Sequence, residues 1–129
     1  MENLIINSSS ETPYFPRVSF NSITGVCEIS GESFMEETYK FYSPLMEWLE
    51  KYLSEKKPVT LNVKLTYFNT SSSRSILDLL DILREYMDSG GKVKVNWYYD
   101  LEDPDMEDEV EDFKAESGLE INLKPFKEK

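Results

Sequence analysis

One block of this sequence, Tyr67-Phe68-Asn69-Thr70-Ser71-Ser72-Ser73, carries side chains suited to phosphoryl chemistry. Each of the five positions from Asn69 to Ser73 offers a hydroxyl or an amide group. A phosphoryl group on one of the hydroxyls would add about −1.5 to −2 charges and three strong acceptor oxygens. Ser, Thr and Asn are also the preferred caps of helix N-termini, so capping is the simpler interpretation. One or two side chains suffice for a cap, and the surplus favours a phosphorylation switch.

The residues before this block predict a β-strand, because apolar and polar side chains alternate from Val59 to Tyr67. One face is expected to carry Val59, Leu61, Val63, Leu65 and Tyr67, and the other Thr60, Asn62, Lys64 and Thr66. This alternation places Phe68 on the opposite face from Tyr67, exposed beside Thr70. An exposed aromatic ring next to a switch residue is suited to contact a partner protein.

The residues after the block predict a helix with one buried stripe. Its apolar positions are Ile76, Leu79, Leu80, Leu83, Tyr86 and Met87, and Ser89-Gly90-Gly91 is expected to end it. A helix N-terminus carries unpaired backbone N–H groups and a partial positive charge, so it favours an anion such as a phosphate. The hydroxyl block therefore stands where a phosphate would be tolerated.

Other segments complete an expected order of β-β-α-β-α-β-α-β. Residues 12–20 and 26–30 are predicted to form a β-hairpin around a five-residue loop. A helical pattern then runs from Tyr39 to Leu53, and Pro44 either begins the main helix or bends a longer one. The remaining predictions are a strand over 92–99, a helix from Asp103-Pro104 to Gly118, and a short strand over 119–123. This order predicts an α/β fold, a mixed sheet whose helices lie mainly on one face.

Composition predicts one domain over 1–129, with flexible ends at 1–11 and 127–129. The net charge of −11 opposes binding to nucleic acid and to anionic membrane surfaces. No segment is long and apolar enough to span a bilayer, so we expect no membrane insertion and a cytoplasmic location. Cys27 is the only cysteine, which excludes an intrachain disulfide and favours a buried thiol.

The chain has no histidine, which removes the commonest general base near neutral pH and the usual Ser/His and Cys/His nucleophile pairs. Nine acidic residues and no basic residue lie between Asp100 and Asp112, but an EF-hand loop fails there because its sixth position lacks glycine. A solvated helix face is the simplest interpretation of this acidic segment, and a docking surface is the second. We therefore expect no metal, no cofactor and no catalysis. A carboxylate enzyme whose hydroxyl cluster binds a substrate phosphate is the weaker alternative.

Several motifs together suggest a family. They are Thr12-Pro13-x-Phe15-Pro16, the stretch from Gly25 through Glu28-Ile29-Ser30-Gly31-Glu32-Ser33, Trp48-Leu49-Glu50 and, most specifically, Tyr67-Phe68-Asn69-Thr70-Ser71-Ser72. With these motifs the chain resembles the SiaC family of bacterial regulatory phosphoproteins over nearly its whole length, from Thr12 to Phe126.

The resemblance implies a small α/β fold similar to STAS domains, the fold of anti-sigma-factor antagonists, and a role without catalysis. It implies that a partner kinase phosphorylates the threonine of the Asn-Thr-Ser-Ser element, here Thr70, and that a PP2C-type phosphatase reverses this step. The unphosphorylated form is then expected to bind and activate a diguanylate cyclase, so that phosphorylation sets cyclic-di-GMP production. A STAS-like antagonist that acts on an anti-sigma kinase is the alternative output of the same chemistry.

The residues around Thr70 supply a mechanism for such a switch. The backbone N–H groups of Ser71, Ser72 and Ser73 are expected to solvate the phosphate, and Arg74, four residues from Thr70, to pair with it. Asn69 completes this supporting group as a further polar side chain. A partner that meets a dianion in place of a neutral hydroxyl would have to desolvate that charge, which disfavours the complex.

Overall fold

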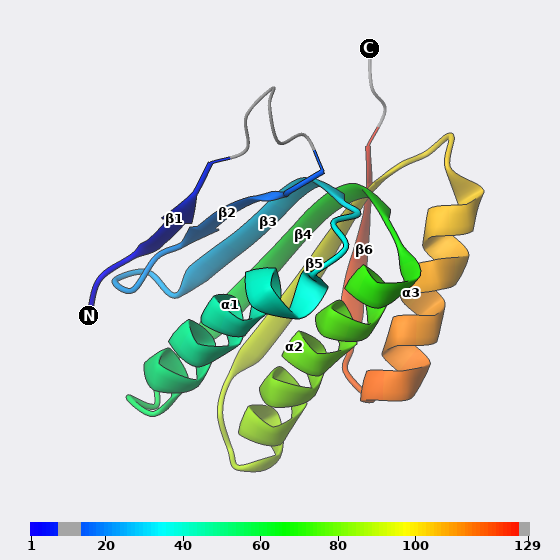
Figure 1. Cartoon of the computed structure of the whole chain (residues 1–129). Helices are drawn as coiled ribbons and strands as arrows, with labels where there is room; N and C mark the ends of the chain where they lie inside the picture. The colour runs from blue at the N-terminus through cyan, green and yellow to red at the C-terminus, as the bar shows by residue number, and fades with distance from the viewer. Residues whose placement is uncertain (8–13, 127–129) are drawn as a thin grey trace.

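A six-stranded mixed sheet, with its strands in sequence order, carries three helices on one face (Figure 1). The computed structural model describes residues 1–7 and 14–126. Its elements in chain order are β1 (Leu4–Ile6), β2 (Arg17–Phe20), β3 (Val26–Ser33), α1 (Thr38–Leu53), β4 (Val59–Phe68), α2 (Thr70–Asp88), β5 (Val93–Asp100), α3 (Pro104–Ser117) and β6 (Ile121–Phe126).

Strand pairing explains why all the helices share one face. Strands β1, β2 and β3 pair antiparallel, whereas β3, β4, β5 and β6 pair parallel, and a helix joins each parallel pair. The parallel strands follow one another in a single direction across the sheet, so crossovers of the usual right hand place every helix on the same side. The predicted α/β class, hairpin and one-sided helical layer are confirmed.

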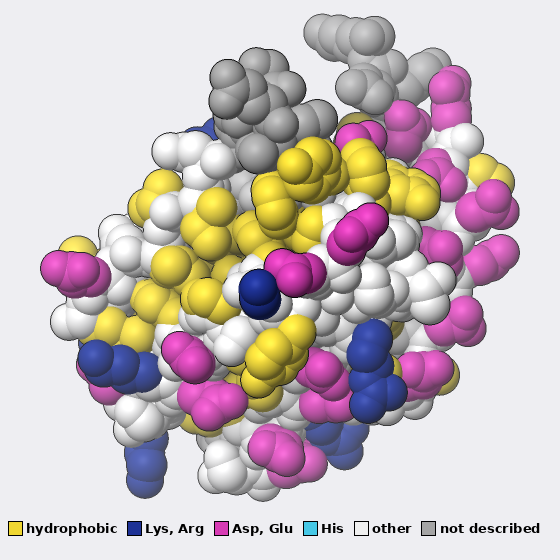
Figure 2. Space-filling view, in the orientation of Figure 1, with side chains coloured by type: hydrophobic (Ala, Val, Ile, Leu, Met, Phe, Trp, Pro, Cys, Tyr) yellow, Lys and Arg dark blue, Asp and Glu magenta, His cyan; other side chains and the backbone are white. Residues whose placement is uncertain are grey.

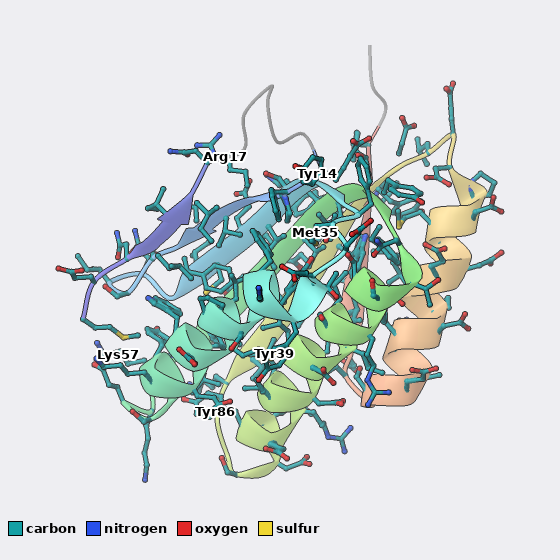
Figure 3. All side chains as sticks on the ribbon, viewed as in Figure 1. Tyr14, Arg17, Met35, Tyr39, Lys57 and Tyr86 are labelled. Atoms are coloured by element: carbon teal, nitrogen blue, oxygen red, sulfur yellow. The ribbon has the colours of Figure 1, made fainter. Side chains whose placement is uncertain are left out.

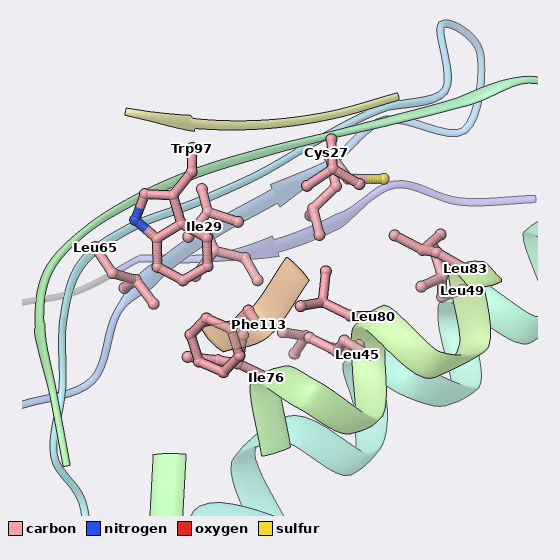
Figure 4. Close-up of a cluster of buried hydrophobic side chains, with 14 of the residues drawn as sticks. Cys27, Ile29, Leu45, Leu49, Leu65, Ile76, Leu80, Leu83, Trp97 and Phe113 are labelled. Atoms are coloured by element: carbon pink, nitrogen blue, oxygen red, sulfur yellow. The ribbon is translucent and has the colours of Figure 1, made fainter. Parts of the chain in front are cut away.

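The core lies between this helical layer and the sheet. Figure 4 shows its central part, in which Trp97 and Ile29 of the sheet face Leu45, Leu80 and Phe113 of the three helices. The opposite face of the sheet is more polar, as predicted. There Asn96 donates to Asn62 at 2.9 Å and accepts from Asn122 at 3.1 Å, so one amide ladder crosses three parallel strands.

The bounds of α3, α1 and β6 can be compared with those predicted from the sequence. Asp103 caps α3 by accepting from the Met106 amide at 3.2 Å, and Gly118 ends the helix with a left-handed φ of 74°. The α1 helix runs through Pro44 from Thr38 to Leu53, so the longer of the two alternatives is correct. Strand β6 begins at Ile121 and reaches Phe126, later and longer than expected.

The N-terminus differs from the expectation of a flexible segment over 1–11. Residues Leu4–Ile6 form strand β1 and pair with Val18 to Phe20 of β2. The polar part of this contact includes Ser22, whose amide and hydroxyl donate to the Asn3 side chain at 2.8 and 3.0 Å. Residues 8–13, which include Thr12 and Pro13 of the family motif, and residues 127–129 lie outside the described part of the chain.

Candidate functional site

The hydroxyl block begins helix α2, and Asn69 is its cap. The Asn69 side chain accepts from the Ser72 amide at 2.8 Å, and its backbone amide donates to the Ser33 carbonyl at 3.0 Å. Its side-chain amide also donates to the Met35 carbonyl at 3.3 Å. Asn69 therefore ties the start of α2 to the end of β3 and to the loop that leads into α1.

Three of the four hydroxyls that follow the cap are engaged inside the protein. The Ser71 hydroxyl donates to the Asn69 side chain at 3.3 Å, and the Ser73 hydroxyl donates to the Thr70 carbonyl at 2.8 Å. Ser72 is fully buried, and its hydroxyl accepts from Ser33 at 2.8 Å. Thr70, by contrast, is exposed, and its hydroxyl has no hydrogen-bond partner among the described residues. The fold thus leaves one hydroxyl of the block free.

The buried Ser72 hydroxyl belongs to a chain of polar groups beneath the site. Tyr42 and Ser33 are also fully buried, and their hydroxyl oxygens lie 2.8 Å apart. The Ser72 hydroxyl lies 3.8 Å from the Met35 sulfur. Each hydroxyl can therefore donate to the next group, Tyr42 to Ser33, Ser33 to Ser72, and Ser72 to the thioether of Met35. Burial raises the pKa of Tyr42 to about 12, which keeps its hydroxyl protonated as a donor. No sequence pattern indicated this chain, because its members come from β3, α1 and α2.

Backbone donors at the helix start differ from the expected set. The Ser72 amide donates to the Asn69 side chain at 2.8 Å and the Ser73 amide to the Asn69 carbonyl at 2.9 Å, so neither is available to a phosphate. The amides of Thr70 and Ser71, the first two of the helix, have no intrahelical acceptor. Arg74 is largely exposed and pairs with Asp78 at 3.6 Å. Thr70 and Ser71, rather than the expected Ser72 and Ser73, therefore carry the backbone N–H groups of this turn that have no acceptor in the helix.

Thr70 lies in a hollow of about 310 Å³ between the start of α2 and helix α3. Phe68, Ser73 and Arg74 share this hollow with Thr70, so the structure brings together four of the residues predicted for the site. The other side of the hollow carries three carboxylates of α3, those of Glu109, Asp112 and Glu116. The acidic run in the sequence was the only signal for two of them, and nothing pointed to Glu116.

Phe68 is not the exposed aromatic ring that the alternation predicts. Between Gly31 and Glu32 the register of β3 with β4 shifts by one residue, so that Gly31 pairs with Leu65 but Glu32 pairs with Tyr67. This bulge reverses the faces of the last residues of β4. The Phe68 ring turns inward, and its centroid lies 5.9 Å from that of the Trp97 ring, whereas Tyr67 is 52% exposed.

Tyr67 belongs to a line of aromatic rings beside the site. The ring centroids of Tyr67 and Phe34 lie 5.6 Å apart, and those of Phe34 and Tyr14 lie 5.9 Å apart. All three side chains are exposed. Figure 3 shows Tyr14 and Met35 at the same end of the sheet, above the start of α1. In Figure 2 hydrophobic side chains gather on this part of the surface. We call Tyr14, Phe34 and Tyr67 the aromatic surface.

Among the residues that the structure describes, no group of three or more Cys, Asp or Glu side chains is placed to hold a metal ion. No helix in residues 1–7 and 14–126 combines the length and apolar character needed to cross a membrane. The acidic segment between Asp100 and Asp112 forms the end of β5, a turn and most of α3, with its carboxylates mostly exposed.

Comparison with known proteins identifies the family and agrees with the overall fold. A model of the SiaC family, described as a family of regulatory phosphoproteins, matches residues 9–126. An uncharacterized protein of Pseudomonas aeruginosa strain UCBPP-PA14 is 26% identical over 129 residues, which cover 99% of this chain and 100% of that protein. The crystal structure of apo-SiaC from Pseudomonas aeruginosa is 26% identical, with a TM-score of 0.88 over 96% of this chain and 99% of that chain.

A further similar chain comes from the crystal structure of the diguanylate cyclase SiaD in complex with its activator SiaC, also from Pseudomonas aeruginosa. It is 25% identical to this chain and has a TM-score of 0.89 over 95% of this chain and 99% of that one. The family resemblance read from the sequence is therefore confirmed over most of the molecule. The chain belongs to the SiaC family of regulatory phosphoproteins.

Proposed function

We propose that this protein is a non-catalytic signalling protein switched by reversible phosphorylation of Thr70, and that its unphosphorylated form binds and activates a diguanylate cyclase. The observation that supports the proposal is that Thr70 has the one hydroxyl of the block that is exposed and makes no hydrogen bond with a described residue. Ser71 and Ser73 use their hydroxyls in local hydrogen bonds, and Ser72 is buried. Thr70 alone in this block is open to a kinase without the loss of an internal contact.

Phosphorylation at this position is compatible with the local structure. A cognate kinase transfers a phosphoryl group from ATP to Thr70 Oγ1, and a PP2C-type phosphatase returns it to water as inorganic phosphate. The free amides of Thr70 and Ser71 and the positive end of α2 favour the added charge. Arg74 shares the hollow and is exposed enough to exchange Asp78 for the phosphate.

The aromatic surface is the contact that we assign to the cyclase. Exposed aromatic rings are enriched among the residues that dominate binding energy at interfaces. Tyr67 and Phe34 lie next to the start of α2, because Asn69 bonds to Ser33 and Met35 on either side of Phe34. A partner on these rings must dehydrate the region around Thr70, and a dianion there makes that dehydration costly. The activator in the solved cyclase complex has the same fold, which supports this partner class.

The experiment compares three variants for binding to the diguanylate cyclase that co-purifies with the protein from its own cells. Thr70→Ala is expected to stay folded, bind the cyclase and resist the kinase. Thr70→Asp is expected to lose most binding, because it places a fixed charge at the same position. Ser71→Asp is the matched control, with the same charge one residue further along the helix, and is expected to keep most of the affinity.

Calorimetry measures the affinity of each variant for the cyclase, and cyclic-di-GMP production measures activation of the cyclase. Intact mass measurement with site mapping shows whether Thr70 carries a phosphate. Equal affinity of the cyclase for unmodified and Thr70-phosphorylated protein would refute the switch. A sigma-factor regulator as the co-purifying partner, in place of a cyclase, would support the STAS-like antagonist alternative.

A further inference from the structure

The hollow that contains Thr70 has a strongly asymmetric charge. One side is the start of α2, with the Thr70 hydroxyl, and the other is α3, with Glu109, Asp112 and Glu116. These three positions follow one another at helical spacing, so their carboxylates lie along one face of α3. Thr70 therefore faces a row of negative charges across a space that belongs to the protein itself.

Little positive charge compensates this row. Helix α3 contains seven acidic residues and one lysine, Lys114, which pairs with Glu111 at 3.5 Å. Arg74 is the cation that lines the hollow, and it pairs with Asp78 of its own helix. Burial and the neighbouring carboxylates of Asp103, Asp105 and Asp112 raise the pKa of Glu109, which reflects the same excess of negative charge.

Helix α3 is held to the rest of the fold by a narrow set of contacts. Its buried apolar side chains are Met106, Val110 and Phe113. At its C-terminal end, Arg84 of α2 donates to the Gly118 carbonyl at 2.6 Å. A narrow apolar stripe makes an element more prone to local opening than the central strands, so modest repulsion can change its stability.

We propose that a phosphoryl group on Thr70 is repelled by the three carboxylates across the hollow, so that phosphorylation loosens α3 from α2. The inference rests on the proposed phosphorylation of Thr70 and adds a second consequence to it. The charge alters the packing of a neighbouring helix as well as the surface around the modified residue. The switch then has two states of the fold, which a kinase, a phosphatase or a cyclase can distinguish.

The size of the effect follows from the geometry of the hollow. A cube with the volume of the hollow, about 310 Å³, has an edge of roughly 7 Å, and we take this as the order of magnitude of the charge separation. It is similar to the Debye length of about 8 Å at physiological ionic strength. Three unit-charge pairs at this separation in water, screened accordingly, change an opening equilibrium by roughly threefold for one added charge. A phosphate with nearly two charges has a larger effect, and high salt removes most of it.

The test uses Thr70→Asp, which places the charge without any kinase. Backbone hydrogen exchange is measured for α3 in the wild-type protein and in the variant. We expect α3 amides to exchange about threefold faster in Thr70→Asp at physiological ionic strength, and faster still at low salt. In a background with Glu109→Gln, Asp112→Asn and Glu116→Gln, the same substitution is expected to leave α3 exchange unchanged.

A second background separates local repulsion from a general effect of net charge. Glu107→Gln, Asp108→Asn and Glu120→Gln remove the same number of charges from exposed positions outside the hollow. In this control background Thr70→Asp is expected to accelerate α3 exchange as it does in the wild type. Equal loss of the effect in both backgrounds overturns the proposal, and so does identical α3 exchange in the wild type and Thr70→Asp.

The results that would refute the proposed signalling role differ from those that would refute the repulsion across the hollow. If site mapping finds no phosphate on Thr70, or if the cyclase ignores it, the signalling role fails while the response of α3 to Thr70→Asp can still be present. If instead phosphorylation blocks the cyclase but α3 exchange never changes, the signalling role stands and the repulsion across the hollow is wrong.

Discussion

The chain of buried hydroxyls beneath the site yields a sharp stability prediction for Ser33→Ala. Ser33 is the middle member, because its hydroxyl accepts from Tyr42 and donates to Ser72, each at 2.8 Å. Alanine at this position leaves the Tyr42 hydroxyl buried without a partner, and an orphaned buried donor costs about 1–3 kcal/mol. Ser72 keeps its contact with the Met35 sulfur at 3.8 Å. We therefore expect a loss of about 2 kcal/mol in the free energy of unfolding.

Tyr42→Phe is the matched comparison, because it removes a hydroxyl from the same chain without leaving a donor unpaired. Ser33 still donates to Ser72 in this variant, so the expected cost is about 1 kcal/mol. When both substitutions are combined, the orphaned phenol disappears. The double variant should therefore cost less than the sum of the two single variants, with a coupling of about 1 kcal/mol.

Urea unfolding followed by circular dichroism measures these differences. With the slope usual for a small domain, Ser33→Ala should lower the urea midpoint by about 1 M. Two results would refute the reasoning. One is a cost for Ser33→Ala no greater than that for Tyr42→Phe, and the other is strict additivity in the double variant.

Two further predictions concern ionisable groups. Burial raises the pKa of Cys27 to about 12, so its thiol should react with a thiol reagent only when the protein is denatured; rapid labelling of the native protein would contradict this. The pKa of Glu109 is raised by partial desolvation first and then by neighbouring carboxylates, so protonation favours the folded state. That stabilisation is lost as the pH rises through the folded pKa. Glu109→Gln should therefore stabilise the protein slightly at neutral pH, as measured by thermal unfolding. The expected gain is about a few tenths of a kcal/mol because the side chain is exposed. Below the unfolded pKa, where glutamate is itself protonated, we expect no gain.

Local patterns in the sequence predicted the elements whose stability is mainly local. Helix α3 begins at its Asp-Pro cap and ends at Gly118, and helix α2 begins directly after Asn69, because capping and periodicity depend on neighbouring residues. Thr70 could be singled out by resemblance alone. The structure adds that the other three hydroxyls of the block make hydrogen bonds within the protein.

The errors arose where partners distant in sequence decide the outcome. The exposure of Phe68 was predicted from strict alternation, but the bulge that reverses the end of β4 is set by the pairing of Gly31 and Glu32 in β3. Strand β1 has three residues and exists through its pairing with β2, so composition near the N-terminus could not reveal it. The availability of the Ser72 amide likewise depended on which side chain capped the helix.

In the proposed switch, the start of α2 meets two requirements with different residues. Folding needs a capped helix anchored to β3 and α1, and this is provided by the Asn69 side chain and the buried Ser72 hydroxyl. Switching needs a hydroxyl that can be modified without breaking those contacts, and Thr70 makes none of them through its side chain. Because the anchored groups lie inside and the free one outside, a phosphate on Thr70 leaves the cap intact. Its effect is then directed outward, toward the aromatic surface and toward the carboxylates of α3.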